Sequence, residues 1–219
     1  MKILFIGIQV WIIYNIFNMS NSVKYAPSTP VPYRYQIAEY QTRPWTVPIP
    51  ETWNTTGSAE CQLSANSIGW YLVIDNGFGF EIPTSSIING IVVEIACRGT
   101  SGTVYDSEVV IVKGGVLGEI NRKNTNAWAS GSFQYVSHGG ATDLWDITWT
   151  PAQINASNFG VAVSPKTIGD ASDADINGVK ITVYYTPTNI KTVNGLARAS
   201  VKTKNFLDIA QIKSFNGLQ

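Results

Sequence analysis

The chain has 219 residues, which is enough for one domain of ordinary size and about fifty residues of arms or linkers. Its 19 glycines, 10 tyrosines and 7 tryptophans, with only 14% charged residues, fit a β-protein with many tight turns. Basic and acidic residues number 15 each, so no electrostatic bias points to a nucleic-acid partner, and two cysteines are too few for a disulfide framework.

Residues 1–18 form an apolar N-terminal segment with a basic start. The segment resembles a signal-peptide core, although no small-x-small cleavage site follows it, and it is shorter than the roughly 20 apolar residues of a membrane span. Two alternatives stay open: translation that begins at Met19, with residues 1–18 an upstream extension, or a buried strand.

Residues 19–57 form an arm rich in proline and aromatic residues. Six of the ten prolines lie between positions 27 and 50, interleaved with Tyr33, Tyr35, Tyr40 and Trp45. Proline fixes φ and removes a backbone donor, so this arm should be extended and irregular and lie outside any central ladder. It packs either on its own domain or on a neighbouring subunit, and the sequence does not choose.

Residues 58–186 are predicted to form an antiparallel β-sandwich of jelly-roll type. The segment 87–98 is the predicted central strand, because Ile91, Val93, Ile95 and Cys97 alternate with Val92, Glu94, Ala96 and Arg98. Further short β-rich runs, bounded by Gly, Pro, Asn or Asp, occupy 77–83, 106–113, 159–163 and 177–185. Such strands at about ten-residue spacing favour a sandwich over a parallel sheet.

Three local features complete this prediction. Cys61 and Cys97 fall on apolar phases of their strands and are expected to be small core residues, with a disulfide as the alternative. Residues 143–150 alternate as a strand would, and Thr150 and Pro151 then suit the N-cap and the first position of one helical turn.

No catalytic constellation accompanies these strands, so we expect neither an enzyme nor a cofactor nor a bound metal. His138 is the only histidine and is expected in a Gly-Gly loop without a nucleophile signature. Carboxylate pairs, Asp143 with Asp146 or Glu94 with Asp106 and Glu108, could form a glycosidase dyad, but exposed strand carboxylates are commoner. The acidic run 170–175 lacks the glycine and distal glutamate of a calcium loop.

Three tryptophans are candidate surface aromatics, namely Trp45, Trp53 and Trp128. Exposed indole rings could stack on sugar rings of a host surface glycan. The alternative is packing in the core or in an interface, where aromatic side chains are commonly found.

Residues 187–219 contain a repeat of eleven residues that we interpret as an assembly tail. Its recurring residues are Ile190, Lys191, Asn194 and Leu196, then Val201, Lys202, Asn205 and Leu207, and finally Ile212, Lys213, Asn216 and Leu218. Asn-Gly is a turn signal, and short apolar strands flank it. One copy cannot bury its apolar side alone, so we expect a homotrimeric β-shaft or strands added to another protein, with a disordered tail as the alternative.

The ordered set of motifs in 58–186 resembles a β-sandwich domain of tailed-bacteriophage virion proteins. The set includes Gly77-Phe-Gly-Phe-x-Ile-Pro83, Ile88-Asn-Gly-Ile-Val-Val-Glu-Ile95 and Trp149-Thr-Pro-Ala-x-Ile-Asn155, and the Lys-Ser/Thr-x-Asn-Gly-Leu repeats resemble those of phage structural proteins. The resemblance implies a tail, fibre or head-decoration protein located in the virion, with other virion proteins and further copies of itself as partners. The alternative, from residues 1–17 and the tryptophans, is a secreted or cell-surface carbohydrate-binding or adhesin module.

Overall fold

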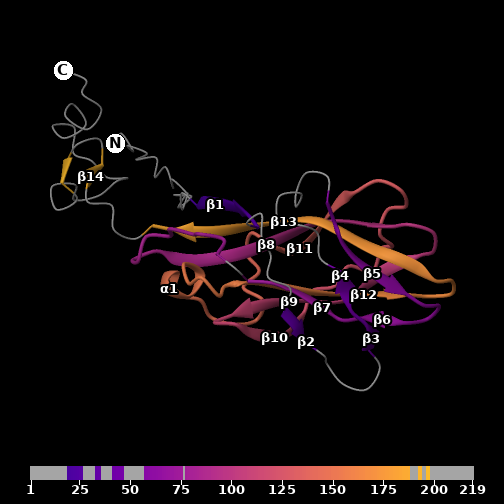
Figure 1. Cartoon of the computed structure of the whole chain (residues 1–219). Coiled ribbons are helices and arrows are strands. Elements are labelled where there is room, and N and C mark those ends of the chain that lie inside the picture. Colours follow the sequence, from indigo (N-terminus) through magenta and orange to yellow (C-terminus); the bar gives the residue numbers. More distant parts are fainter. Residues whose placement is uncertain are drawn as a thin grey trace, which may run out of the picture.

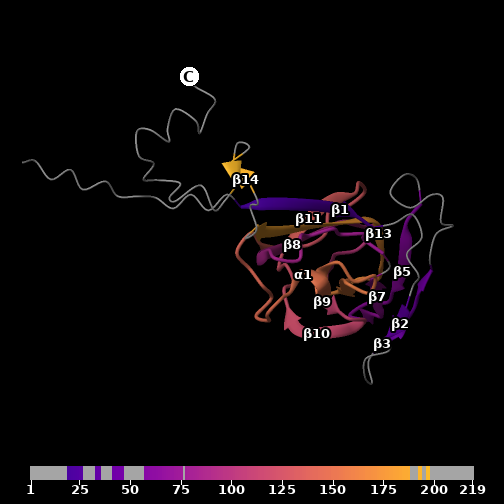
Figure 2. The same ribbon diagram turned by 90° about the vertical axis from the view of Figure 1, so that its left-hand side faces the viewer.

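The computed structural model describes residues 19–26, 33–35, 41–46, 57–75, 77–187, 192–193 and 196–197. Two β-sheets pack face to face and enclose one core (Figure 1). Seen along the sandwich, β8, β11 and β13 lie in one layer and β9 and β10 in the other (Figure 2). Among the described residues, no helix has the length and apolar character needed to span a membrane.

The first sheet has six strands, which are paired in the order β11 (Gln134–Gly140), β8 (Ile87–Gly99), β13 (Ser172–Thr186), β5 (Ala59–Leu63) and β4 (Trp45–Thr46), with β1 (Ser20–Tyr25) also on β13. The second sheet has seven strands, paired in the order β10 (Val116–Asn121), β9 (Val104–Lys113), β12 (Gly160–Thr167), β6 (Ile68–Gly69) and β3 (Gln41–Arg43), with β7 (Tyr71–Ile74) on β12 and β2 (Tyr33–Tyr35) on β7. A separate hairpin joins β14 (Thr192–Val193) and β15 (Leu196–Ala197).

The connections between the sheets give the jelly-roll topology that the sequence predicts. From β5 onward, the chain crosses from sheet to sheet after β5, β7, β8, β10, β11 and β12, so the order β5-β13-β8-β11 faces the order β7-β12-β9-β10. These eight strands form two interlocking Greek keys. The predicted fold class, an all-β antiparallel sandwich, is therefore confirmed.

The strand β8 is central, as its alternation predicts, because β13 pairs on one side of it and β11 on the other. Ile91, Val93, Ile95 and Cys97 are at most 1% exposed and point into the core. Cys97 and Cys61 are both buried and free, so the interpretation as small core residues is confirmed over a disulfide.

Two segments predicted as strands are loops instead. In 77–83, Gly77 and Gly79 have φ of 71° and 66°, which breaks the ladder, yet Phe78, Phe80 and Ile82 are buried as anchors. The alternation of apolar residues in this segment therefore indicates burial of their side chains and not pairing with another strand.

In 143–150 the predicted strand alternation is wrong, because Trp145 and Asp146 adopt left-handed φ of 58° and 54° and turn the chain. This turn drives the Trp145 indole fully into the core. The following helical turn, α1 (Pro151–Ile154), begins where the sequence places it, with Thr150 as the N-cap of a capping box.

The described residues of the proline-rich arm lie on the arm's own sandwich and supply edge strands. β4 pairs with β5, β3 pairs with β6, and β2 pairs with β7. β1 pairs with the last part of β13, from Ser20 opposite Tyr185 to Tyr25 opposite Lys180. The described residues of the arm therefore pack on the same chain, and the rest of the predicted arm lies outside the described residues.

Candidate functional site

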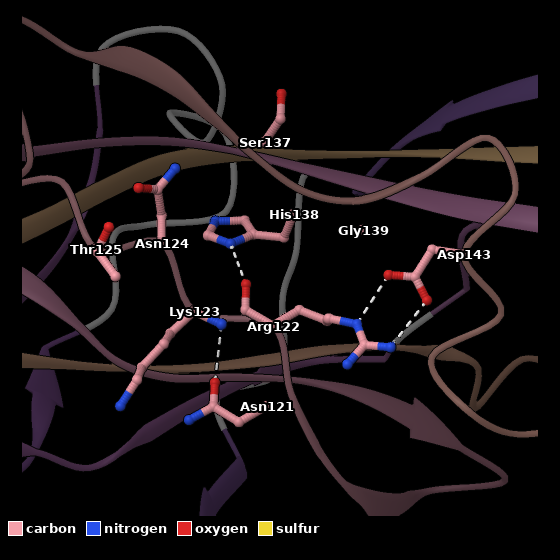
Figure 3. Close-up of a pocket in the computed structure, with 9 residues that line it drawn as sticks. All are labelled: Asn121, Arg122, Lys123, Asn124, Thr125, Ser137, His138, Gly139 and Asp143. Carbon is pink, nitrogen blue, oxygen red and sulfur yellow. Dashed lines mark hydrogen bonds and ion pairs between the residues drawn. The ribbon is translucent and has the colours of Figure 1, made fainter.

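A polar cleft lies beside β11, where the chain leaves β10. Residues 121–125 follow β10, and 137–139 belong to β11, and together with Asp143 they line a cleft of about 440 Å³ (Figure 3). β10 and β11 are edge strands of opposite sheets, so the cleft opens along one side of the sandwich.

Arg122 joins the two walls of this cleft through two carboxylates. Its Nε donates to Asp143 Oδ2 at 2.8 Å and its second guanidinium nitrogen to Asp143 Oδ1 at 3.1 Å (Figure 3). The same nitrogen lies 3.0 Å from Asp146 Oδ2. Hydrogen bonds from Arg122 lower the pKa of Asp143, and the hydrogen bond to Asp143 raises the pKa of Arg122. The guanidinium is therefore held by protein carboxylates.

A buried polar cluster lies beneath the cleft around Asp106, which is 2% exposed. The Trp128 indole Nε1 donates to Asp106 Oδ1 at 2.8 Å, and the backbone N–H of Asn124 donates to Oδ2 at 2.7 Å. His138 Nδ1 lies 3.7 Å from Oδ2 and 3.0 Å from the Arg122 carbonyl oxygen. The loop 122–128 is thus fastened to β9 and β11 by side chains from both sheets.

The expectation that His138 is a loop residue is wrong, because His138 belongs to β11 and is 2% exposed. Its Nε2 is buried and has no hydrogen-bond partner within the described part of the chain. Val136 and His138 share the inward face of β11, a period-2 signal that the sequence does contain.

Gly139, also in β11, admits the Trp145 indole behind the cleft. Gly139 has φ of 77°, and a Cβ there would lie 2.4 Å from the Ile91 carbonyl oxygen and 2.9 Å from Trp145 Nε1. Because the side chain is absent, Trp145 Nε1 can donate to that carbonyl at 3.1 Å. Gly139 thus leaves the space that the Trp145 indole occupies.

Most of the carboxylates considered above as glycosidase dyads are instead bound to basic side chains or buried. Arg122 holds Asp143 and Asp146 together, and the lowered pKa of Asp143 is the opposite of what a general acid needs. Glu94 pairs with Lys180 at 2.7 Å on the outer face of the first sheet, whereas Asp106 is buried. The side chains of the cleft therefore form hydrogen bonds and ion pairs that connect the two sheets.

The acidic run 170–175 is also divided between separate surroundings. Asp175 is buried and accepts a hydrogen bond from Arg98 Nε at 2.9 Å, while Thr100 Oγ1 lies 3.4 Å from Asp173 Oδ2. Burial raises the pKa of Asp175 and the hydrogen bond from Arg98 opposes this. No cluster of metal-ligating side chains occurs among the residues described.

Two of the three candidate surface tryptophans are core residues, which corrects their assignment as surface aromatics. Trp45 is 4% exposed and donates from Nε1 to the Trp70 carbonyl at 2.7 Å, and Trp128 is 5% exposed. Each ring is covered because its N–H finds an acceptor inside the sandwich. Trp53 lies outside the described residues.

An apolar hollow of about 410 Å³ occupies the end of the sandwich where β8 begins and β13 ends. Met19, Ile87, Ile88, Leu144 and Thr186 line it. Met19 and Ile87 are exposed large apolar side chains, while Ile88 is buried beneath them. Ser20 lies opposite Tyr185, so the chain enters and leaves the sandwich beside this hollow.

The first copy of the C-terminal repeat forms the short strands expected of it. β14 pairs antiparallel with β15, Val193 lies opposite Leu196, and two residues, Asn194 and Gly195, separate them. The remaining candidate assembly residues of the tail, namely Ile190, Lys191, Asn194 and those of the second and third copies, lie outside the described residues.

Comparisons with known proteins add little to this description. No family model matches the chain, and a search of curated proteins found no match. Among solved structures, the N-terminal cellulose-binding domain of β-1,4-glucanase C from Cellulomonas fimi aligns with a TM-score of 0.33 and 15% identity, over 57% of this chain and 78% of that chain.

Proposed function

We propose that this chain is a non-enzymatic structural component of a bacteriophage virion, a tail, fibre or head-decoration protein. It assembles through its terminal segments, with other virion proteins and further copies of itself as partners, and displays the jelly roll. The resemblance of 58–186 to phage virion domains and the eleven-residue repeat of 187–219 motivate the proposal.

The observation that carries the proposal is the shared departure point of the two terminal segments. Ser20 lies opposite Tyr185 in the β1–β13 pair, so residues 1–18 and 187–219 are both attached at one end of the sandwich. β13 has 15 residues, and at about 3.3 Å per residue the far end lies up to about 45 Å away. A domain attached at one end presents its opposite loops to the surroundings.

The tail has the properties of an element that associates with other chains. Residues 190–219 hold five basic residues and one acidic residue, a net charge of +4. The hairpin β14–β15 has two residues per strand, and in the described part of the chain it pairs with no other strand. Isolated hairpins are at best marginally stable, so the repeats should gain stability by pairing with further strands.

Two measurements test the proposal. Mass spectrometry of purified particles should detect the protein, and a chain that lacks 187–219 should be lost from particles and should lose its self-association in light scattering. Absence of the intact protein from particles refutes the virion assignment. Unchanged incorporation and oligomeric state without the tail refute assembly through the repeats.

A second candidate function, a secreted carbohydrate-binding or adhesin module, is favoured by one surface. Tyr25 and Tyr135 are 57% and 52% exposed on the outer face of the first sheet, on either side of the Lys180–Glu94 ion pair. Tyrosine rings stack on sugars, and paired charges bond to hydroxyl groups.

This second function is tested by affinity electrophoresis in gels that contain polysaccharide. Tyr135→Ala should abolish retardation, and Val116→Ala, at an exposed position of β10, should not. Equal mobility of both variants and the parent chain in every polysaccharide tested would contradict glycan binding at this face. N-terminal sequencing that shows a mature start beyond Ser20 would support export.

A further inference from the structure

We propose that the apolar hollow lined by Met19, Ile87, Ile88, Leu144 and Thr186 is covered by a second copy of this chain. The inference rests on the proposed self-assembly through 187–219 and adds a specific contact surface to it. The hollow is then an interface between sandwiches, next to the tails that hold the copies together.

The hollow has the composition of an interface. It is lined mainly by apolar surface, and its rim carries Ile87, which is 58% exposed, and Met19, which is 47% exposed. Ile87 is the first residue of β8 and pairs with Thr186, the last residue of β13. Two large apolar side chains held at a rigid sheet end lose unfavourable contact with water when another surface covers them.

The position of the tail is the reason for proposing a second copy as the occupant. Thr186 lines the hollow and β14 begins at Thr192, six residues later, so the connection spans at most about 20 Å at 3.3–3.6 Å per residue. Figure 1 shows β13 ending at the side of the sandwich on which β14 lies.

Two copies whose β14–β15 hairpins touch therefore carry their hollows within about 40 Å of each other, twice this reach. This separation is no larger than the length of one sandwich along β13, about 45 Å. Association through these hairpins thus brings this apolar end of each copy toward its neighbour and leaves the far end apart.

The test uses thiol cross-linking on the full chain, which suits this protein because both of its cysteines are buried. Ile87→Cys places a thiol at the hollow. Ile168→Cys is the matched control, since Ile168 is 56% exposed and lies just before β13, at the opposite end of the sandwich. Each variant is treated with a flexible bis-maleimide and examined by denaturing electrophoresis, beside light scattering of the untreated protein.

We expect an oligomeric chain in which Ile87→Cys gives covalent dimers at least five times more abundantly than Ile168→Cys. If light scattering shows a monomer, the self-assembly of the proposed function fails, and this inference fails with it. If the chain is oligomeric and the two variants cross-link equally, the inference alone is overturned. A third result also overturns the inference. If the Ile87→Cys thiol is protected from a monofunctional maleimide but forms no cross-linked dimer, the hollow is covered by residues 1–18 of the same chain.

Discussion

Replacement of Trp128 by phenylalanine tests whether the buried polar cluster around Asp106 stabilises the sandwich. The change keeps an aromatic ring in the core but removes the indole N–H that donates to Asp106 Oδ1 at 2.8 Å. Trp128 is 5% exposed and Asp106 is 2% exposed, so water cannot replace the lost donor without opening the loop. The variant should fold with a lower free energy of unfolding.

The magnitude follows from two contributions. A hydrogen bond to a carboxylate contributes about 1.5–3 kcal/mol, and loss of its donor leaves a buried acceptor with one partner fewer. Phenylalanine also lacks two ring carbons of tryptophan, at about 0.8 kcal/mol for each buried carbon. Together these predict a decrease of about 3–4.6 kcal/mol in the free energy of unfolding.

Trp45→Phe is the matched control, because Trp45 is 4% exposed and donates at 2.7 Å to the carbonyl oxygen of Trp70, a neutral acceptor. It loses the same atoms, and its hydrogen bond contributes about 0.5–1.5 kcal/mol, so the expected decrease is about 2–3 kcal/mol. Urea unfolding followed by circular dichroism measures both. An equal or smaller effect at Trp128 than at Trp45 would refute the special role given to the Asp106 carboxylate.

Three further predictions concern the neighbourhood of the cleft and the core. Gly139→Ala should cost at least about 3 kcal/mol, because its Cβ meets the backbone 2.4 Å away at a left-handed φ, and a fully stable variant in urea unfolding would contradict this. The lowered pKa of Asp143 gives stability that is present above the ordinary aspartate pKa of 3.8 and is lost as the pH falls below it. In acid titrations Asp143→Asn should therefore show a flatter loss of stability between about pH 4 and 2, and an unchanged slope would exclude this contribution. Burial raises the pKa of the Cys61 thiol to about 12 and also raises that of Cys97. A thiol reagent at pH 8 should consequently react with no cysteine in the folded protein and with both cysteines in urea. Rapid labelling without urea would show that the core opens.

The cleft could not be predicted as a unit from the sequence, because its partners come from distant segments and both sheets. Arg122 and Asp143 are 21 residues apart, and Asp106 and His138 are 32 apart. Only the register of β11 against β8, with His138 opposite Val93, turns the histidine inward. The one local signal is the period-2 spacing of His138 from Val136, and the two glycines that follow favour a loop instead.

The loop at 143–150 shows why local alternation misleads. A period-2 pattern predicts a strand, but Trp145 and Asp146 adopt left-handed conformations that no strand contains. The strain is compensated by a tertiary hydrogen bond from Trp145 Nε1 to the Ile91 carbonyl oxygen and by a local one from the Trp145 backbone N–H to Asp143 Oδ1 at 2.7 Å. Burial of the indole therefore overrides the local preference.

The sequence by itself determined the sandwich class, the central strand, the core cysteines, the capped helical turn and the hairpin of the first repeat. Each of these follows from spacing within about ten residues, where backbone periodicity and capping chemistry act directly. The tertiary structure decided that the proline-rich arm pairs with its own sheets and that Trp45 and Trp128 are buried. It also decided that the chain enters and leaves beside one apolar hollow. These outcomes depend on which strands pair across long separations, and that pairing is fixed only when two whole sheets close over a common core.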